Sequence, residues 1–177
     1  MTWPDVVWSS PVLRPLDARG RADVEAAGAL RDLGAGELVF RPGQPADAFF
    51  VVAGGRVGVR AVRRGEVDAT VIREIGEGES FGEEGTLRAG GTRHMEAAAL
   101  AATRVAEIPL GVFRRAVERA SSNAEVAQRQ ERALRRAATR DLLRTIAFAR
   151  HMPDSDVEVL LDAIEHVTLE RCEALFR

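Results

Sequence analysis

The chain of 177 residues contains no lysine, and all 25 of its basic side chains are arginines. It therefore offers no amine for a Schiff base and no lysine for a P-loop, which excludes both kinds of site. Cysteine is almost absent as well. Cys172 stands alone and cannot form an internal disulfide, which favours a reducing, cytoplasmic environment.

The sequence also lacks a charge excess and a long apolar segment. The arginines are balanced by 27 acidic residues, whereas proteins that coat nucleic acids or anionic membranes need a strong basic excess. Apolar runs such as 97–102 fall far short of the roughly 20 residues that a membrane span needs, and residues 1–5 do not resemble the start of a secretion signal. We therefore expect a cytoplasmic protein with no direct nucleic-acid partner and no membrane partner.

Helical and strand-like patterns divide the chain. Residues 17–33 carry apolar side chains at helical spacing, with Asp17 as N-cap and Gly34 at the end, and they predict one helix. From residue 36 to 109, short runs rich in Val, Ile and Phe alternate with Gly, Pro and Asp, which is typical of a β-roll or sandwich. The predicted strands cover residues 37–41, 48–53, 56–62, 67–74, 96–100 and 104–109.

After Pro109 the pattern becomes helical again. It predicts a short helix over 110–120, a long one from 123 to about 150, and a further one over 154–166. The fold class is therefore α+β: an antiparallel, jelly-roll-like β-roll (a double-stranded β-helix) flanked by N- and C-terminal helices. The long helix has an apolar stripe that could pair with a second copy in a homodimer or with a partner domain of the same chain. The stripe consists of Val126, Leu134, Ala138, Leu142 and Ile146.

An internal repeat predicts the domain organisation. The pattern Leu33-x-x-x-Glu37-x-x-Phe40-Arg41 recurs near the end as Leu169-x-x-x-Glu173-x-x-Phe176-Arg177. Each copy follows an amphipathic helix, and the two copies lie about one domain length apart. We therefore expect a first domain at 10–145 and the start of a second, truncated domain of the same kind at 148–177.

The candidate functional residues lie at the two ends of an irregular stretch in the predicted roll. Phe81-Gly82-Glu83 opens it and Thr92-Arg93 closes it. A helical turn after Gly82 would offer backbone N–H groups to an anion, and the glycine would allow a close approach. Arg93 can pair bidentately with a phosphate, and the Glu83 carboxylate can accept hydrogen bonds from a sugar hydroxyl. These residues indicate a phosphorylated sugar as ligand.

The sequence resembles the cyclic nucleotide-binding domains of regulatory kinase subunits, gated channels and catabolite-activator-type regulators. Residues 36–57 resemble the first hairpin pair of that family, and 76–83 resemble the approach to its phosphate-binding cassette. Arg93 stands where the family has its phosphate arginine. The resemblance covers about residues 10–145. It implies a regulatory domain without catalytic activity, with cyclic AMP or cyclic GMP as ligand and no further cofactor.

The resemblance also implies roles for individual residues. Glu83 would bind the ribose 2′-hydroxyl, Gly82 would contribute backbone contacts, and Arg93 would hold the cyclic phosphate. Ligand binding would pull in the cassette and re-pack the C-terminal helices, which is the signal that such domains relay. The residues that would bind ligand are Gly82, Glu83, Glu84, Gly85, Arg93, His94 and, against the base, Thr139.

Departures from the family pattern leave an alternative open. His94 replaces a small or hydroxylated residue, and Glu84 and Glu96 stand where the family has uncharged ones. A carboxylate within about 4–6 Å of a bound anion would cost a kilocalorie per mole or more. The alternative is a ligand-free scaffold that mediates protein–protein interaction or dimerisation, in which Glu84 and Glu96 exclude the anion and the stripe of the long helix binds the partner. Arg93 could in addition form a structural ion pair with Glu96 or Glu83.

Other functions find less support in the sequence. A cupin-type metal site needs a His-x-His pair, and the chain has none among its 3 histidines. No nucleophile–base pair indicates an enzyme. Arginines on the long helix are diluted by acidic residues and predict a solvated face.

Overall fold

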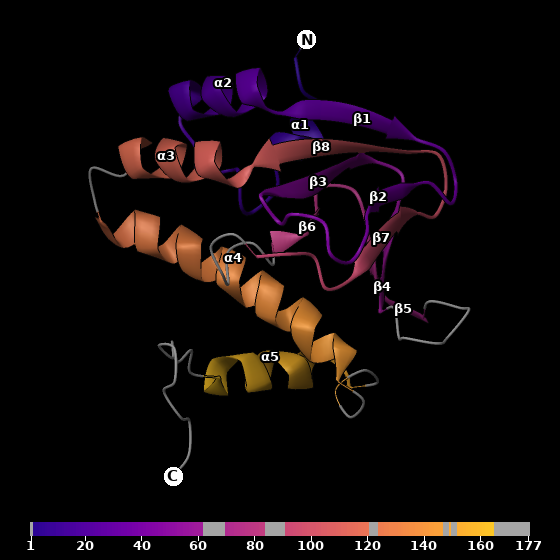
Figure 1. The fold of residues 1–177 in the computed structure, drawn as a ribbon. Coiled ribbons are helices and arrows are strands. Elements are labelled where there is room, and N and C mark those ends of the chain that lie inside the picture. The colour runs from indigo at the N-terminus through magenta and orange to yellow at the C-terminus, as the bar shows by residue number, and fades with distance from the viewer. Residues whose placement is uncertain are drawn as a thin grey trace.

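The computed structural model describes residues 2–61, 70–83, 91–120, 124–146, 149 and 152–164. It is an α+β fold in which two antiparallel sheets form a β-roll, with helices at both ends of the sequence packed around it (Figure 1). The fold class predicted from the sequence is confirmed.

Each sheet contains four strands. One has the order β1-β8-β3-β6 and the other β2-β7-β4-β5, with antiparallel pairing throughout. Six of these strands were predicted, within a few residues at their ends. The strands are β1 (Ala29–Leu33), β2 (Leu38–Phe40), β3 (Ala48–Gly54), β4 (Val57–Ala61), β5 (Thr70–Ile75), β6 (Ser80–Phe81), β7 (Glu96–Ala99) and β8 (Thr103–Pro109).

Strand β3 is buried on both faces, which explains its unbroken apolar sequence. Side chains alternate across a strand, so Phe49 and Val51 face one way while Phe50 and Val52 face the other. Phe49 and Val51 join the cluster beneath the helices, and Phe50 and Val52 join the cluster inside the roll. The strand thus lies between the interior of the roll and its helical cover.

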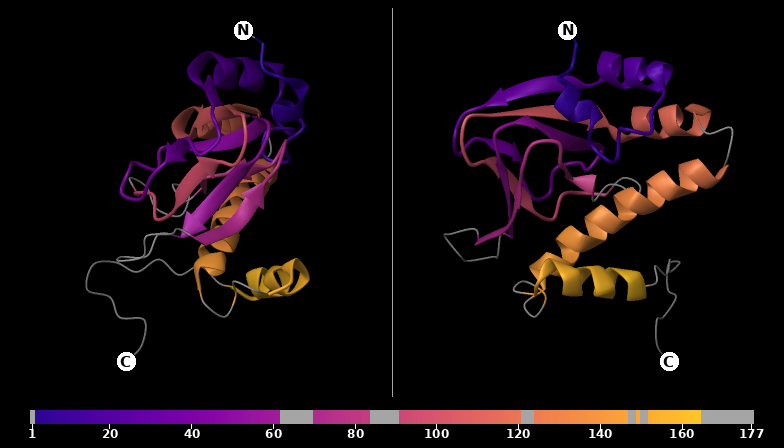
Figure 2. Two further views of the ribbon diagram at one scale, coloured as in Figure 1. Left: turned by 90° about the vertical axis from the view of Figure 1, so that its right-hand side faces the viewer. Right: turned by 180° about the vertical axis from the view of Figure 1, so that it is seen from behind.

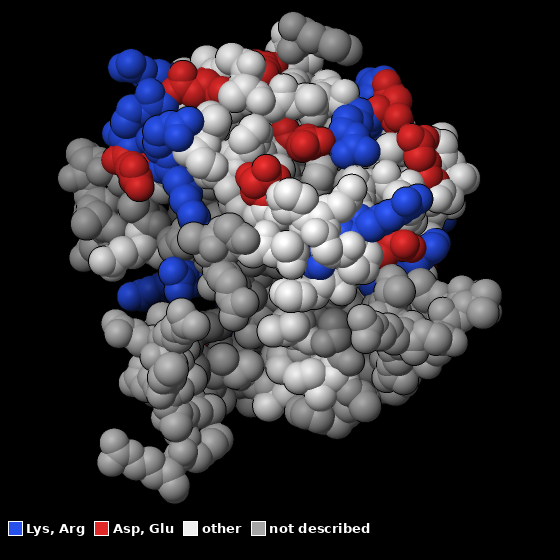
Figure 3. All heavy atoms as spheres, viewed as in Figure 1, with Lys and Arg blue, Asp and Glu red and all other residues white. Residues whose placement is uncertain are grey.

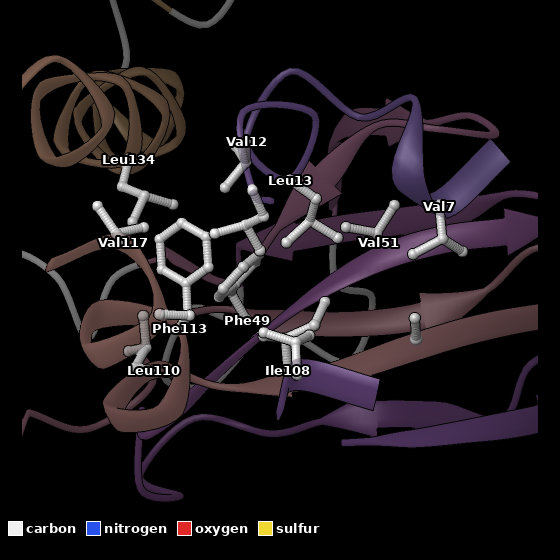
Figure 4. Close-up of a cluster of buried hydrophobic side chains, with 14 of the residues drawn as sticks. Val7, Val12, Leu13, Phe49, Val51, Ile108, Leu110, Phe113, Val117 and Leu134 are labelled. Carbon is white, nitrogen blue, oxygen red and sulfur yellow. The ribbon is translucent and has the colours of Figure 1, made fainter. Parts of the chain in front are cut away.

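Helices α2 (Ala18–Ala27) and α3 (Leu110–Ala120) pack against each other on one side of the roll (Figure 1). A four-residue helix, α1 (Asp5–Trp8), precedes them. The cluster under these helices includes Phe49 from β3 and Phe113 from α3, whose rings meet edge to face at 5.2 Å (Figure 4). Leu134 of the next helix closes the same cluster.

The predicted helix over 17–33 is wrong in its second half. Asp17 caps the helix as expected, accepting a hydrogen bond from the Gly20 backbone at 2.7 Å, but the helix ends at Ala27 and β1 follows. The chain changes from helix to strand at Gly28. The backbone of Gly28 lies close to β8, since a Cβ there would be 2.5 Å from the Glu107 carbonyl oxygen. Pairing with β8 overrides the local preference, and Asp32 lies opposite Arg104 with two hydrogen bonds between them.

Helix α4 (Ala124–Thr145) runs diagonally past the roll, and the chain then turns back so that α5 (Asp154–Ala163) lies beside the C-terminal end of α4 (Figures 1 and 2). Both helices are shorter than predicted. Arginines of α4 form ion pairs with carboxylates of α5: Arg136 pairs with Glu158 at 2.7 Å and with Asp162 at 2.6 Å, and Arg140 pairs with Glu158. We call this set of ion pairs the α4–α5 clasp.

The apolar stripe of α4 is only partly covered. Leu134 and Ala138 are fully buried, whereas Leu142 and Ile146 are 45% and 43% exposed. The predicted boundary between domains 10–145 and 148–177 falls after this helix. Since residues 165–177 lie outside the described part of the chain, the second domain stays a prediction.

Acidic and basic side chains both occur over the described part of the face in Figure 3. Within the described residues, none of the helices has the length and apolar character that crossing a membrane demands.

Candidate functional site

The site begins at the short strand β6. Phe81 pairs with Phe50 of β3, and the chain then turns sharply at Gly82, where φ is +79°. A Cβ on Gly82 would lie 3.0 Å from an Arg93 terminal nitrogen and 3.1 Å from the Phe40 ring. Only glycine combines this left-handed conformation with so close an approach. Glu83 follows directly and is fully buried.

Arg93 reaches the same place from the far side of the irregular stretch. Its side chain is 2% exposed, and its two terminal nitrogens donate to the carbonyl oxygens of Gly82 and Ala48, both at 2.5 Å. Its backbone is held by Gln44 and Gly43, each through a hydrogen bond of 2.8 Å. The structure therefore fixes this arginine at both the backbone and the guanidinium.

Aromatic rings surround the guanidinium. Its carbon lies 4.3 Å from the ring centroid of Phe40 and 5.5 Å from that of Phe50. Phe81 stacks on both rings, at 6.1 and 5.3 Å. A cation in such apolar surroundings is poorly screened, so its attraction for an anion is stronger than at the surface.

The structure places the Arg93 guanidinium against Gly82, which Glu83 follows directly in the chain, and it separates other candidates. His94 is exposed, because it lies between the inward-facing Arg93 and Met95. Thr139 is buried on α4, where its hydroxyl donates to the Arg135 carbonyl at 2.8 Å. It lines a cavity of about 250 Å³ with Leu161 and Ile164, residues that lie in or directly after α5.

Two predicted residues, Glu84 and Gly85, lie outside the described part of the chain. Glu96, which the sequence raised as a competitor for the anion, pairs instead with Arg60 on the neighbouring strand at 3.7 Å. Among the described residues, no group of three or more His, Cys, Asp or Glu side chains could hold a metal ion.

Sequence reasoning missed the residues that hold Arg93. The contribution of Ala48 is a backbone carbonyl, which no side-chain pattern can reveal. Phe40 and Phe50 lie in predicted strands. The alternation of side chains along each strand was the available signal that these rings point into the roll. They come from different sheets, so only the closed roll places both beside the arginine.

Comparison with solved structures supports the same architecture. The sensor domain of the transcriptional regulator DNR from Pseudomonas aeruginosa is similar with a TM-score of 0.67 and 18% identity, over 93% of this chain and 95% of that one. The N-terminal domain of a transcriptional regulator from Streptomyces coelicolor A3(2) is similar with a TM-score of 0.55 and 26% identity, over 80% and 94%.

A third similar structure is the regulatory domain of Toxoplasma gondii PKA, crystallised with cAMP. The TM-score is 0.59 and the identity 19%, over 90% of this chain and 56% of that one. Comparison with curated proteins gives no match. The sequence model of the cyclic nucleotide-binding domain matches residues 30–120, which is just over half of the chain and includes the turn at Gly82 and Arg93. The chain therefore belongs to the cyclic nucleotide-binding domain family.

Proposed function

We propose that the protein is a regulatory domain without catalytic activity that senses a cyclic nucleotide, cyclic AMP or cyclic GMP, and relays binding through its C-terminal helices. One observation carries this proposal: the buried Arg93 guanidinium lies against the Gly82 turn, and the next residue of the chain, Glu83, is a buried carboxylate. The cyclic phosphate would pair with Arg93, and the Glu83 carboxylate would accept from the ribose hydroxyl.

Binding would exchange hydrogen-bond partners at Arg93. Its terminal nitrogens donate to the neutral carbonyls of Gly82 and Ala48. A phosphate oxygen carries a negative charge that a carbonyl oxygen lacks, so its hydrogen bond with the guanidinium gains the attraction between opposite charges. An incoming phosphate would therefore compete for these donors, and both carbonyls would have to adjust. The cassette turn and the start of β3 are thereby coupled to the ligand.

The start of β3 offers a route from the site to the helices. Ala48 follows Asp47, whose carbonyl accepts a hydrogen bond of 2.9 Å from Leu110, the first residue of α3. The next residue of β3, Phe49, packs against Phe113 of α3. A shift at the Ala48 carbonyl would act on α3 through both contacts.

Helix α3 would pass the change to α4. Phe113 and Val117 of α3 share one buried cluster with Leu134 of α4 (Figure 4). A re-packing of this cluster would move α4 along with α5, because the α4–α5 clasp ties the two helices together. The exposed end of the α4 stripe, at Leu142 and Ile146, is where we expect a second copy or a partner domain to read the output.

A second candidate, a ligand-free scaffold for protein–protein interaction, is favoured by one feature of the site. Arg93 is 2% exposed and already donates to two carbonyls, so it satisfies a structural role in the roll without a nucleotide. In this case the Gly82–Arg93 contact would stabilise the turn alone, and α4 would bind its partner constitutively.

Thermal unfolding with cyclic AMP or cyclic GMP separates the two candidates. At a ligand concentration about 100-fold above Kd, binding stabilises the folded state by about 2.7 kcal/mol, a rise in Tm of about 5–11 °C for a chain of this size. Arg93→Lys should abolish most of the rise, since lysine cannot pair bidentately. The matched control is Arg104→Lys, at an exposed arginine paired with Asp32 on the outer surface. No rise with either nucleotide would favour the scaffold.

A further inference from the structure

The contact between Arg93 and Phe40 differs from the other contacts of this arginine. The guanidinium carbon lies 4.3 Å from the ring centroid of Phe40, well inside the roughly 6 Å limit of a cation–π interaction. Phe40 is 5% exposed, so water does not separate the ring from the cation. Phe50, which lies in the other sheet, contributes a second ring, and its centroid is 5.5 Å from the guanidinium carbon.

A ring in this position constrains the guanidinium without blocking it. The guanidinium carbon lies over the Phe40 ring, so the ring occupies one side of the cation and leaves its other sides to hydrogen-bond acceptors. The two carbonyl bonds fix where the terminal nitrogens lie, and the ring limits how far the guanidinium can move on its side. A phosphate must therefore approach Arg93 from a side that the ring does not occupy.

We infer that Phe40 is the positioning residue of the phosphate arginine: its ring holds the Arg93 guanidinium in the place where a cyclic phosphate is bound. This inference rests on the proposed function and adds a determinant of affinity. Because Phe40 acts through the phosphate, its removal affects all cyclic nucleotides by the same factor. A residue that contacts the base would instead discriminate between them.

The test compares three substitutions in the same aromatic cluster. Phe40→Leu keeps an apolar side chain but removes the ring face, and Phe40→Tyr restores the ring. Phe81→Leu is the packing control, since Phe81 is also buried and stacks on both Phe40 and Phe50. Affinities for cyclic AMP and cyclic GMP are measured by calorimetry at one ionic strength.

We expect Phe40→Leu to weaken binding of both nucleotides by about 3- to 30-fold, the range of a desolvated cation–π contact. Phe40→Tyr should bind nearly as well as the original protein, and Phe81→Leu should lose much less than Phe40→Leu. Equal losses in Phe40→Leu and Phe81→Leu would overturn the inference, because the ring would then act only through core packing.

A second readout does not depend on binding. The side-chain Nε–H resonance of Arg93, assigned by its loss in Arg93→Lys, should carry a ring-current shift that shrinks in Phe40→Leu, where only the more distant Phe50 ring remains, and persists in Phe40→Tyr. If the original protein binds neither nucleotide, the proposed function fails and this spectrum alone decides the positioning role. A resonance that does not move in Phe40→Leu overturns it.

Discussion

Replacing Gly82 with alanine tests the geometry of the site with the smallest possible change to a side chain. The substitution adds one methyl group at a residue whose φ is +79°, where a side chain is strained. The new Cβ would lie 3.0 Å from Arg93, 3.1 Å from the Phe40 ring and 3.2 Å from the Phe50 ring. The methyl group would contact the guanidinium itself and the two rings beside it, so the strain falls on the binding site.

The expected cost has two parts. The left-handed conformation costs an alanine about 1–2 kcal/mol, and overpacking of a tight site typically adds about 1–3 kcal/mol. Gly82→Ala should therefore lower the free energy of unfolding by about 2–5 kcal/mol. Gly36 provides the matched control, because its φ is +81° and nothing lies within 4 Å of its would-be Cβ. Gly36→Ala should show the first part alone, about 1–2 kcal/mol.

Urea unfolding of both variants measures the difference, and cyclic nucleotide titration of the folded variants measures its effect on the site. Gly82→Ala should be less stable than Gly36→Ala by about 1–3 kcal/mol and should lose affinity, because the methyl group displaces Arg93. Equal stabilities, with affinity unchanged in both, would mean that Arg93 does not approach the Gly82 turn as described.

Other parts of the fold give further tests. Asp17→Ala should lower the free energy of unfolding by about 1 kcal/mol in urea, because the cap on the Gly20 backbone is lost; an unchanged value would refute the cap. Hydrogen bonds from Arg136 lower the pKa of Glu158, so this carboxylate stabilises the fold at neutral pH and ceases to do so as pH falls through its lowered pKa. The stability lost in Glu158→Gln, about 0.5 kcal/mol at this partly exposed pair, should therefore shrink on acidification, and a constant loss between neutral and acid pH would contradict the clasp. Phe113→Leu should leave nucleotide affinity largely intact but reduce the ligand-induced change in hydrogen exchange of α4, and an undiminished change would exclude this route.

Most of the roll was predictable because its strands carry their own signal. The run at β3 is apolar on both faces, and Gly or Pro marks the turns around it, so local sequence and tertiary burial agree. Strand β1 was missed for the opposite reason. Its residues also fit helical spacing, and pairing with β8, through Asp32 and Arg104 among others, decides the conformation. Strand β6 has only two residues, too few for a periodic pattern.

The sequence pointed to the charged residues of the candidate site and not to the residues that support Arg93. Gly82, Glu83 and Arg93 were proposed from residue type and order, and the structure shows Arg93 bonded to the Gly82 turn and Glu83 buried next to it in the chain. The support of Arg93 comes from the Ala48 carbonyl and the Phe40 ring, which lie on different sheets. Such contacts depend on how the roll closes, and no local pattern encodes them.

A crystal structure of the protein soaked with cyclic AMP or cyclic GMP tests the central proposal most directly. We predict the cyclic phosphate within hydrogen-bond distance of the Arg93 guanidinium and the ribose hydroxyl on the Glu83 carboxylate, with at least one of the carbonyl bonds to Gly82 and Ala48 released. A nucleotide bound elsewhere, with Arg93 still donating to both carbonyls, would contradict this account.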